Sequence, residues 1–99
     1  MEDRTRPLSW HDEDQFWRNT FSTRPYTVSA PDYEVWQGAY RYGYEAARHH
    51  HGREWHDVEP ELARGWSSYE HRGESTWEHI KAAVRDAWDR AIHHSVVTK

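Results

Sequence analysis

The chain has 99 residues and a formal net charge of −4, so it lacks the basic character of a nucleic-acid-binding domain. It contains no cysteine, which excludes disulfides and thiolate metal sites, and no apolar run approaches the ~20 residues that span a membrane. The acidic first residues are not followed by an apolar signal segment. We therefore expect one soluble helical domain over residues 1–99, located in the cytoplasm, with no nucleic-acid or membrane partner.

The composition predicts a core built from aromatic side chains. Only 35% of the residues are hydrophobic, but seven Trp, six Tyr and two Phe are among them. Each of these side chains buries about 150–250 Å² when enclosed, so few positions can supply a whole core. Together with the helical patterns described next, this predicts a small all-α, four-helix domain.

A first helix follows an N-terminal arm. Residues 1–8 carry charge without an apolar period, which predicts a loose arm. Ser9 with Asp12 and Glu13 is typical of a helix N-terminus, so we expect the helix to begin at about Ser9 or Asp12 and to end at Thr20. Three aromatic side chains then share one face: Trp10, Trp17 and Phe21.

Residues 22–31 interrupt the helical pattern. Pro25 and Pro31 restrict themselves and the preceding residues to extended or turn conformations. Tyr26 and Val28 alternate with polar neighbours. We expect an extended Pro-bounded segment that turns these two side chains towards the core.

The sequence defines the centre of the second helix but not its first residue. Residues 39–48 read as helical, whereas Gly38 leaves the first residue undetermined. Gly43 lies on the aromatic face, where its missing side chain predicts close approach by another helix. The histidines at 49–51 and then Gly52 end the helix.

The third helix is limited by a proline. Because proline is tolerated in a first turn, Pro60 places the start near Asp57, and the helix then runs to about Tyr69 or Glu70. Gly73 separates it from the fourth helix.

The fourth helix opens with a capping box at residues 75–78 and is expected from Thr76 to about His93, followed by a loose tail at 94–99. Its outer face offers two ion pairs at i,i+4 spacing: Arg85–Asp89 and Asp86–Arg90.

One pattern recurs at a spacing of 22 residues. Offsets of 0, 3, 7 and 11 lie on one face of a helix, because each is close to a whole number of turns. The pattern occurs three times, at Tyr33, Trp36, Tyr40 and Tyr44, at Trp55, Val58, Leu62 and Trp66, and at Trp77, Ile80, Val84 and Trp88. Three such stripes can close one core, so the repeat indicates folding and specifies no chemistry.

Three motifs resemble a family of small bacterial proteins that are usually described as hypothetical. They read YRYGYE at residues 40–45, WxDVExxL at 55–62 and SxWExIKxAVRxAWDR at 75–90. The resemblance implies a single bacterial domain associated with stress-response genes, and it brings no catalytic residues. The family pattern has a proline where this chain has Gly38.

Histidines supply the first candidate site. Glu45 with His49, and Asp89 with His93, are carboxylate–imidazole pairs at i,i+4 spacing. A transition-metal site needs three or four converging ligands, and the chain has neither a His-x-x-x-His nor a Glu-x-x-His motif. We therefore expect no metal site, and we interpret these histidines as exposed cations near helix C-termini.

Other patterns carry less weight. Residues 40–44 mix tyrosines with an arginine, as single-strand nucleic-acid platforms do, but a helix points these side chains apart. Ser67, Ser68 and His71 are close only in sequence, and the acidic side chains at 57, 59 and 61 are explained by their place in a first turn.

The functional expectation is a non-catalytic interaction or stress-associated protein without a cofactor. Seven Trp exceed the need of a small four-helix core, which favours a homodimer that shares indole surface. The alternative is a histidine-dependent binder of a metal ion or a small anionic ligand.

Overall fold

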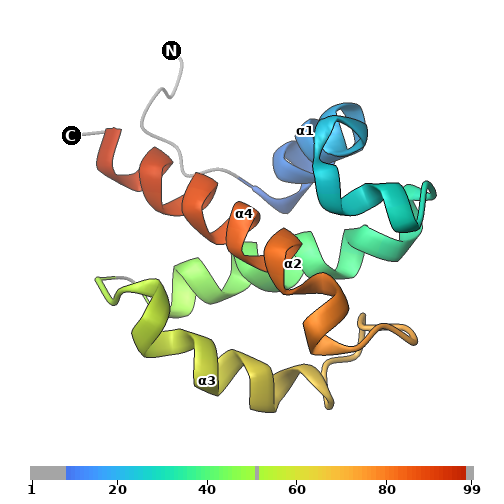
Figure 1. Cartoon of the computed structure of the whole chain (residues 1–99). Helices are drawn as coiled ribbons and strands as arrows, with labels where there is room; N and C mark the ends of the chain where they lie inside the picture. The colour runs from blue at the N-terminus through green and yellow to red at the C-terminus, as the bar shows by residue number, and fades with distance from the viewer. Residues whose placement is uncertain (1–8, 51, 98–99) are drawn as a thin grey trace.

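Four α-helices and two short 3₁₀ helices make up the part of the chain that the computed structural model describes, residues 9–50 and 52–97. The α-helices are α1 (Trp10–Thr20), α2 (Tyr33–His49), α3 (Trp55–Trp66) and α4 (Trp77–Val97). The 3₁₀ helices η1 (Phe21–Thr23) and η2 (Pro25–Ser29) connect α1 to α2. No strand occurs among the described residues, which confirms the all-α prediction. Helices α2 and α4 lie between α1 and α3 (Figure 1).

The contact between α2 and α4 is made where α2 carries a glycine. A Cβ atom on Gly43 would lie 2.2 Å from the backbone oxygen of Val84 and 3.0 Å from the Cβ of Ala87. Both distances are shorter than a van der Waals contact, so only glycine fits at this crossing. The predicted close approach of a neighbouring helix at Gly43 is confirmed.

The 22-residue repeat forms the core. Ten of its twelve members are buried, and the other two, Trp55 and Trp77, are half-buried and pack against the same cluster. Trp66 and Trp88, which are equivalent positions in the repeat, are each 3% exposed. Amphipathic periodicity therefore identified the inward face of α2, α3 and α4.

Aromatic side chains join α3 to the α2–α4 pair. The ring of Tyr42 on α2 packs edge-on against Trp66 on α3, at 5.2 Å between centroids, and its hydroxyl donates to the carbonyl of Leu62 at 2.7 Å. The indole of Trp77 on α4 donates to the carboxylate of Glu59 on α3 at 3.0 Å. Each aromatic side chain thus combines apolar contact area with one hydrogen bond to a neighbouring helix.

The segment between α1 and α2 differs from its expected conformation. Residues 22–31 were expected to be extended, but most of them form η1 and η2. The cause is Thr27, which is 5% exposed and donates its hydroxyl hydrogen to the carbonyl oxygens of Phe21 and Arg24, closing tight turns. Tyr26 points inward as expected, whereas the expectation for Val28 was wrong, since this side chain is 83% exposed.

The start of α2 and the end of α3 also differ from the expected boundaries. α2 begins at Tyr33, so Gly38 lies inside the helix, where a Cβ atom would come within 2.1 Å of the backbone oxygen of His71. α3 begins at Trp55, ahead of the expected start near Asp57, so Pro60 lies inside the helix and not in its first turn. The helix ends at Trp66 rather than at Tyr69 or Glu70. The chain beyond Trp66 turns so that the Tyr69 hydroxyl reaches the Glu45 carboxylate at 3.0 Å.

α4 starts one residue later and runs further than expected. Because its first residue is Trp77, the hydroxyl that accepts a backbone N–H is that of Thr76, from His79 at 3.4 Å, and the expected box at 75–78 is displaced by one residue. Residues 94–97, expected to be loose, continue the helix to Val97, whereas the expected arm at 1–8 and the last two residues lie outside the described part. Across that described part, no helix is sufficiently long and apolar to cross a bilayer.

A first prediction concerns the helix crossing. Gly43→Ala should lower the free energy of unfolding by about 1–3 kcal/mol, because the new methyl group meets the rigid backbone of α4, even though alanine favours the helix by ~1 kcal/mol. Denaturant unfolding followed by circular dichroism measures the change. Ala82→Gly, at an exposed position of α4, reports helix propensity alone. An alanine variant at position 43 as stable as the parent would contradict the close contact.

A second prediction concerns the repeat. Trp88→Ala should destabilise the protein by about 3–5 kcal/mol, as truncation of a large buried side chain leaves a cavity. Domains have only ~5–15 kcal/mol in total, so the variant should melt at a much lower temperature or be partly unfolded. A melting temperature equal to that of the parent protein would show that Trp88 is not part of a packed core.

Candidate ligand cleft between helices α1 and α4

The two candidate carboxylate–imidazole pairs do not form. The Nδ1 atom of His49 lies 2.9 Å from the backbone oxygen of Glu45, and that of His93 lies 2.8 Å from the backbone oxygen of Asp89. The Glu45 carboxylate instead contacts Arg41 at 3.0 Å. Over the described residues, no three His, Asp or Glu side chains converge as metal ligands do. Both histidines are exposed, as expected, and His49 is the last residue of α2, whereas α4 continues past His93 to Val97.

The other sequence candidates are also dispersed. Tyr40 and Tyr44 are buried, so their ring faces are not open to bases. The carboxylates at 57, 59 and 61 point apart: Glu59 accepts from Trp77, while Glu61 accepts from Arg53 at 2.9 Å. The three indoles that are not buried, those of Trp10, Trp55 and Trp77, pack against the core. The indole surplus that favoured a homodimer is used within one chain, and self-association stays a prediction.

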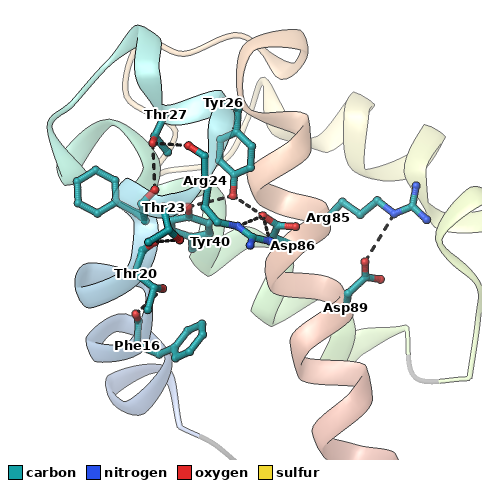
Figure 2. Close-up of polar contacts among 11 residues, drawn as sticks. Phe16, Thr20, Thr23, Arg24, Tyr26, Thr27, Tyr40, Arg85, Asp86 and Asp89 are labelled. Atoms are coloured by element: carbon teal, nitrogen blue, oxygen red, sulfur yellow. Dashed lines mark hydrogen bonds and ion pairs between the residues drawn. The ribbon is translucent and has the colours of Figure 1, made fainter.

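A cleft of about 490 Å³ opens between α1, η1 and α4. Its walls mix aromatic, hydroxyl and charged side chains (Figure 2). α1 and η1 with the residue after it contribute Phe16, Trp17, Thr20, Thr23 and Arg24, and α4 contributes Asp86, Asp89, Arg90 and His93. None of these residues was expected to share a site, apart from the Asp89–His93 pair.

One wall of the cleft is a polar network around Asp86. Its Oδ2 atom accepts from Arg24 Nε at 2.9 Å and from the Tyr26 hydroxyl at 2.5 Å, and the Tyr26 oxygen lies 3.0 Å from the Tyr40 oxygen (Figure 2). Burial raises the pKa of Tyr26 far above its usual range, and the hydrogen bond to Asp86 raises it further. The expected Asp86–Arg90 ion pair was wrong, because Asp86 turns to these partners on the connection between α1 and α2.

Arg90, which also lines the cleft, belongs to an enclosed ion pair. Glu13 of α1 is 0% exposed, and both of its carboxylate oxygens accept from Arg90 Nε at 3.1 Å. The guanidinium of Arg90 also lies 3.6 Å from the centroid of the Phe16 ring. A buried carboxylate requires a charged partner of this kind, because removing one partner leaves an uncompensated charge. Arg90 of α4 is therefore held in place by two residues of α1, Glu13 and Phe16.

Trp17, another residue of the cleft lining, has a buried polar group without a hydrogen-bond partner among the described residues. Its ring is 3% exposed and stacks on Tyr40 at 4.3 Å between centroids, with planes only 8° apart. Its buried Nε1–H has no hydrogen-bond partner among the described residues. By contrast, the indoles of Trp36 and Trp66 each donate to a backbone carbonyl at 2.8 Å. A buried donor without an acceptor costs about 1–3 kcal/mol, so an acceptor that reached this N–H would stabilise the folded protein.

The sequence analysis missed Glu13 and Arg24 as site residues, and it assigned Asp86 and Arg90 to the outer face. One signal was available: Asp86 and Arg90 are spaced three and seven residues after Ala83, so they border the apolar stripe instead of opposing it. Nothing comparable marks Arg24, whose partner is 62 residues away.

Comparison with protein-family models, with curated proteins and with solved structures finds no match to this chain.

A third prediction concerns alkaline pH. Burial raises the pKa of Tyr40 to about 12, and it also raises those of Tyr26 and Tyr33. Between about pH 10 and 12 the unfolded chain loses phenolic protons that the folded state retains, so stability is complete below pH 10 and falls above it. Each such tyrosine contributes a slope of about 1.4 kcal/mol per pH unit.

The measurement is the free energy of unfolding as a function of pH, recorded beside the phenolate absorbance. The protein should unfold cooperatively within roughly two units above pH 10, together with a rise in absorbance. Tyr40→Phe removes one titrating group, and its slope should be shallower by about 1.4 kcal/mol per unit. An unchanged slope in this variant would show that Tyr40 ionises as easily in the folded protein as in the unfolded chain.

Proposed function

We propose that this protein is a non-catalytic binding protein that holds a small polar ligand in the cleft between α1 and α4. The observation that carries the proposal is a cleft whose lining combines Arg24 and Arg90 with Trp17, an indole whose buried Nε1–H has no acceptor among the described residues. Of the functions expected from the sequence, this favours ligand binding over self-association. It moves the binding site from the histidine pairs to the arginine-lined cleft.

The volume and lining of the cleft support binding of a small molecule. Ligand pockets have about 300–1,000 Å³ and combine apolar walls with a few placed polar groups. The cleft has about 490 Å³, with Phe16 and Trp17 as apolar surface and two arginines as donors. A small molecule with a hydrogen-bond acceptor would satisfy the indole once the side chains that cover Nε1 shift to admit it.

The hydroxyl groups in the cleft support a non-catalytic role. Thr20 donates to the carbonyl of Phe16 at 2.8 Å, and Thr23 donates to the carbonyl of Thr20 at 2.7 Å. A nucleophilic hydroxyl must donate its hydrogen to a general base, and an amide carbonyl cannot serve as one. The Asp86 carboxylate is likewise occupied, by Arg24 and Tyr26.

The cellular location and the biological role of the protein are also part of the proposal. A cytoplasmic location is consistent with a chain that contains no cysteine. The association with bacterial stress responses rests on the resemblance of the three sequence motifs.

A fourth prediction tests the ligand cleft. Isotope-labelled protein is titrated with four small probes of different charge, namely acetate, ethylamine, leucine and glycerol, while the indole N–H signals are followed by NMR. At least one probe should shift the Trp17 signal in a saturable way, because its acceptor replaces the missing partner. The Trp77 signal, whose N–H already donates to Glu59, is the internal control and should not move.

Trp17→Phe removes the N–H donor but also replaces the buried indole that stacks on Tyr40 by a smaller ring, so its free energy of unfolding is measured beside its affinity. It should weaken binding of the active probe about tenfold, which corresponds to one hydrogen bond of ~1.4 kcal/mol. If none of the four probes moves the Trp17 signal, the proposed function is wrong.

A further inference from the structure

We infer that the ligand of this cleft is a zwitterion of the α-amino acid type, bound through its carboxylate and its ammonium group together. This inference rests on the proposed function and specifies the chemical class of the ligand. It is argued from three features of the cleft: the balance of charge, the donors that remain open and the acceptor beside them.

The charges that line the cleft balance. Each of these charges has a partner of opposite sign: Arg24 pairs with Asp86, Arg90 with Glu13, and Asp89 with Arg85. In a partly enclosed site, a ligand with net charge adds a charge that nothing compensates, whereas a zwitterion brings one of each sign. A balanced cleft therefore suits a ligand that is itself balanced.

The carboxylate would be bound by Arg90 and Trp17, which meet at one aromatic ring. The Arg90 guanidinium lies 3.6 Å from the Phe16 centroid, and the Trp17 ring lies edge-on to Phe16 at 4.8 Å between centroids. Within the described residues, Arg90 donates to Glu13 from Nε alone, so its terminal amino groups are open to another acceptor. The Trp17 N–H, which has no partner among the described residues, is buried and becomes a further donor to the carboxylate only when the side chains that cover it shift.

The ammonium group would be bound by Asp89, the neighbour of Arg90 in the chain. The side chain of Asp89 is half-exposed and lies 3.8 Å from Arg85 Nε, which is an ion pair but too long for a hydrogen bond. Its oxygens can therefore accept from an ammonium group. Because an α-amino acid carries both charged groups on one carbon, it needs partners of opposite sign side by side, and Asp89 and Arg90 meet that requirement. Phe16 then supplies apolar contact for a ligand side chain.

The experiment compares three probes on the intact protein: leucine, leucinamide, which lacks the carboxylate, and N-acetyl-leucine, which lacks the ammonium group. Affinity is measured by calorimetry, and the Trp17 indole signal is followed by NMR. Leucine should bind at least about tenfold more tightly than either analogue, because each analogue leaves one charged partner without its counterpart. Leucine and N-acetyl-leucine should shift the Trp17 signal, since both carry the carboxylate.

Asp89→Asn separates the two charged contacts. It should weaken leucine at least about tenfold while N-acetyl-leucine binds as before or more tightly. Asp89 is half-exposed, so the variant should fold, and Asp57→Asn on α3 is the matched control that should leave all three affinities unchanged.

Equal binding of N-acetyl-leucine and leucine by the parent protein would overturn the zwitterion and leave the proposed cleft in place. If none of the three compounds binds while acetate still shifts the Trp17 signal, the zwitterion is again overturned and the proposed cleft remains. If no probe, including those of the fourth prediction, binds or shifts the Trp17 signal, both the zwitterion and the proposed ligand cleft are wrong.

Discussion

The contact of α4 with Gly43 on α2 is the constraint on which the rest of the structure depends. A side chain at position 43 would collide with the backbone of Val84, so the two helices approach each other only because that side chain is missing. Their closeness brings the stripe of Trp36 and Tyr40 and the stripe of Ile80 and Val84 into one cluster. The aromatic rings then fill the space on both sides of the crossing. Composition alone would suggest too little apolar material, but a few large rings around one tight crossing are sufficient.

Charged and polar side chains attach α1 and the connection to α2 onto this centre. Asp14 of α1 accepts from Tyr33 at 2.7 Å and from Gln37 at 2.9 Å. Although burial raises the pKa of Asp14, these hydrogen bonds outweigh it and hold the pKa below its usual value. The Glu13–Arg90 pair joins α1 to α4 in the same way. Enclosed pairs of this kind add little net stability, but they fix which surfaces meet, since a mispaired arrangement would leave a buried charge alone.

The cleft is a consequence of that attachment. The Trp17 ring of α1 is stacked on Tyr40, and the 3₁₀ segment that follows α1 is joined to α4 by the hydrogen bonds of Arg24 and Tyr26 to Asp86. Arg24 and Arg90 span the space that remains, each held by a carboxylate. The buried indole N–H of Trp17 has no acceptor in the described part of the chain, although the indoles of Trp36 and Trp66 reach backbone carbonyls. The binding function proposed above thus rests on an exception to a rule that the rest of the core obeys.

Local sequence patterns were enough to predict the helices and the core. The offsets of the repeat identified Tyr40, Val58 and Val84 as buried, because helical period and apolar burial depend only on local geometry and side-chain type. The sequence also placed Gly43 at a helix contact. It did not determine helix ends, since Thr27 and Thr76 act through hydrogen bonds that compete with several local alternatives. Only the tertiary structure decided the cleft. The partner of Asp86 is 62 residues away and that of Arg90 is 77 residues away, and long polar side chains at such separations meet according to how the helices pack, which no local pattern encodes.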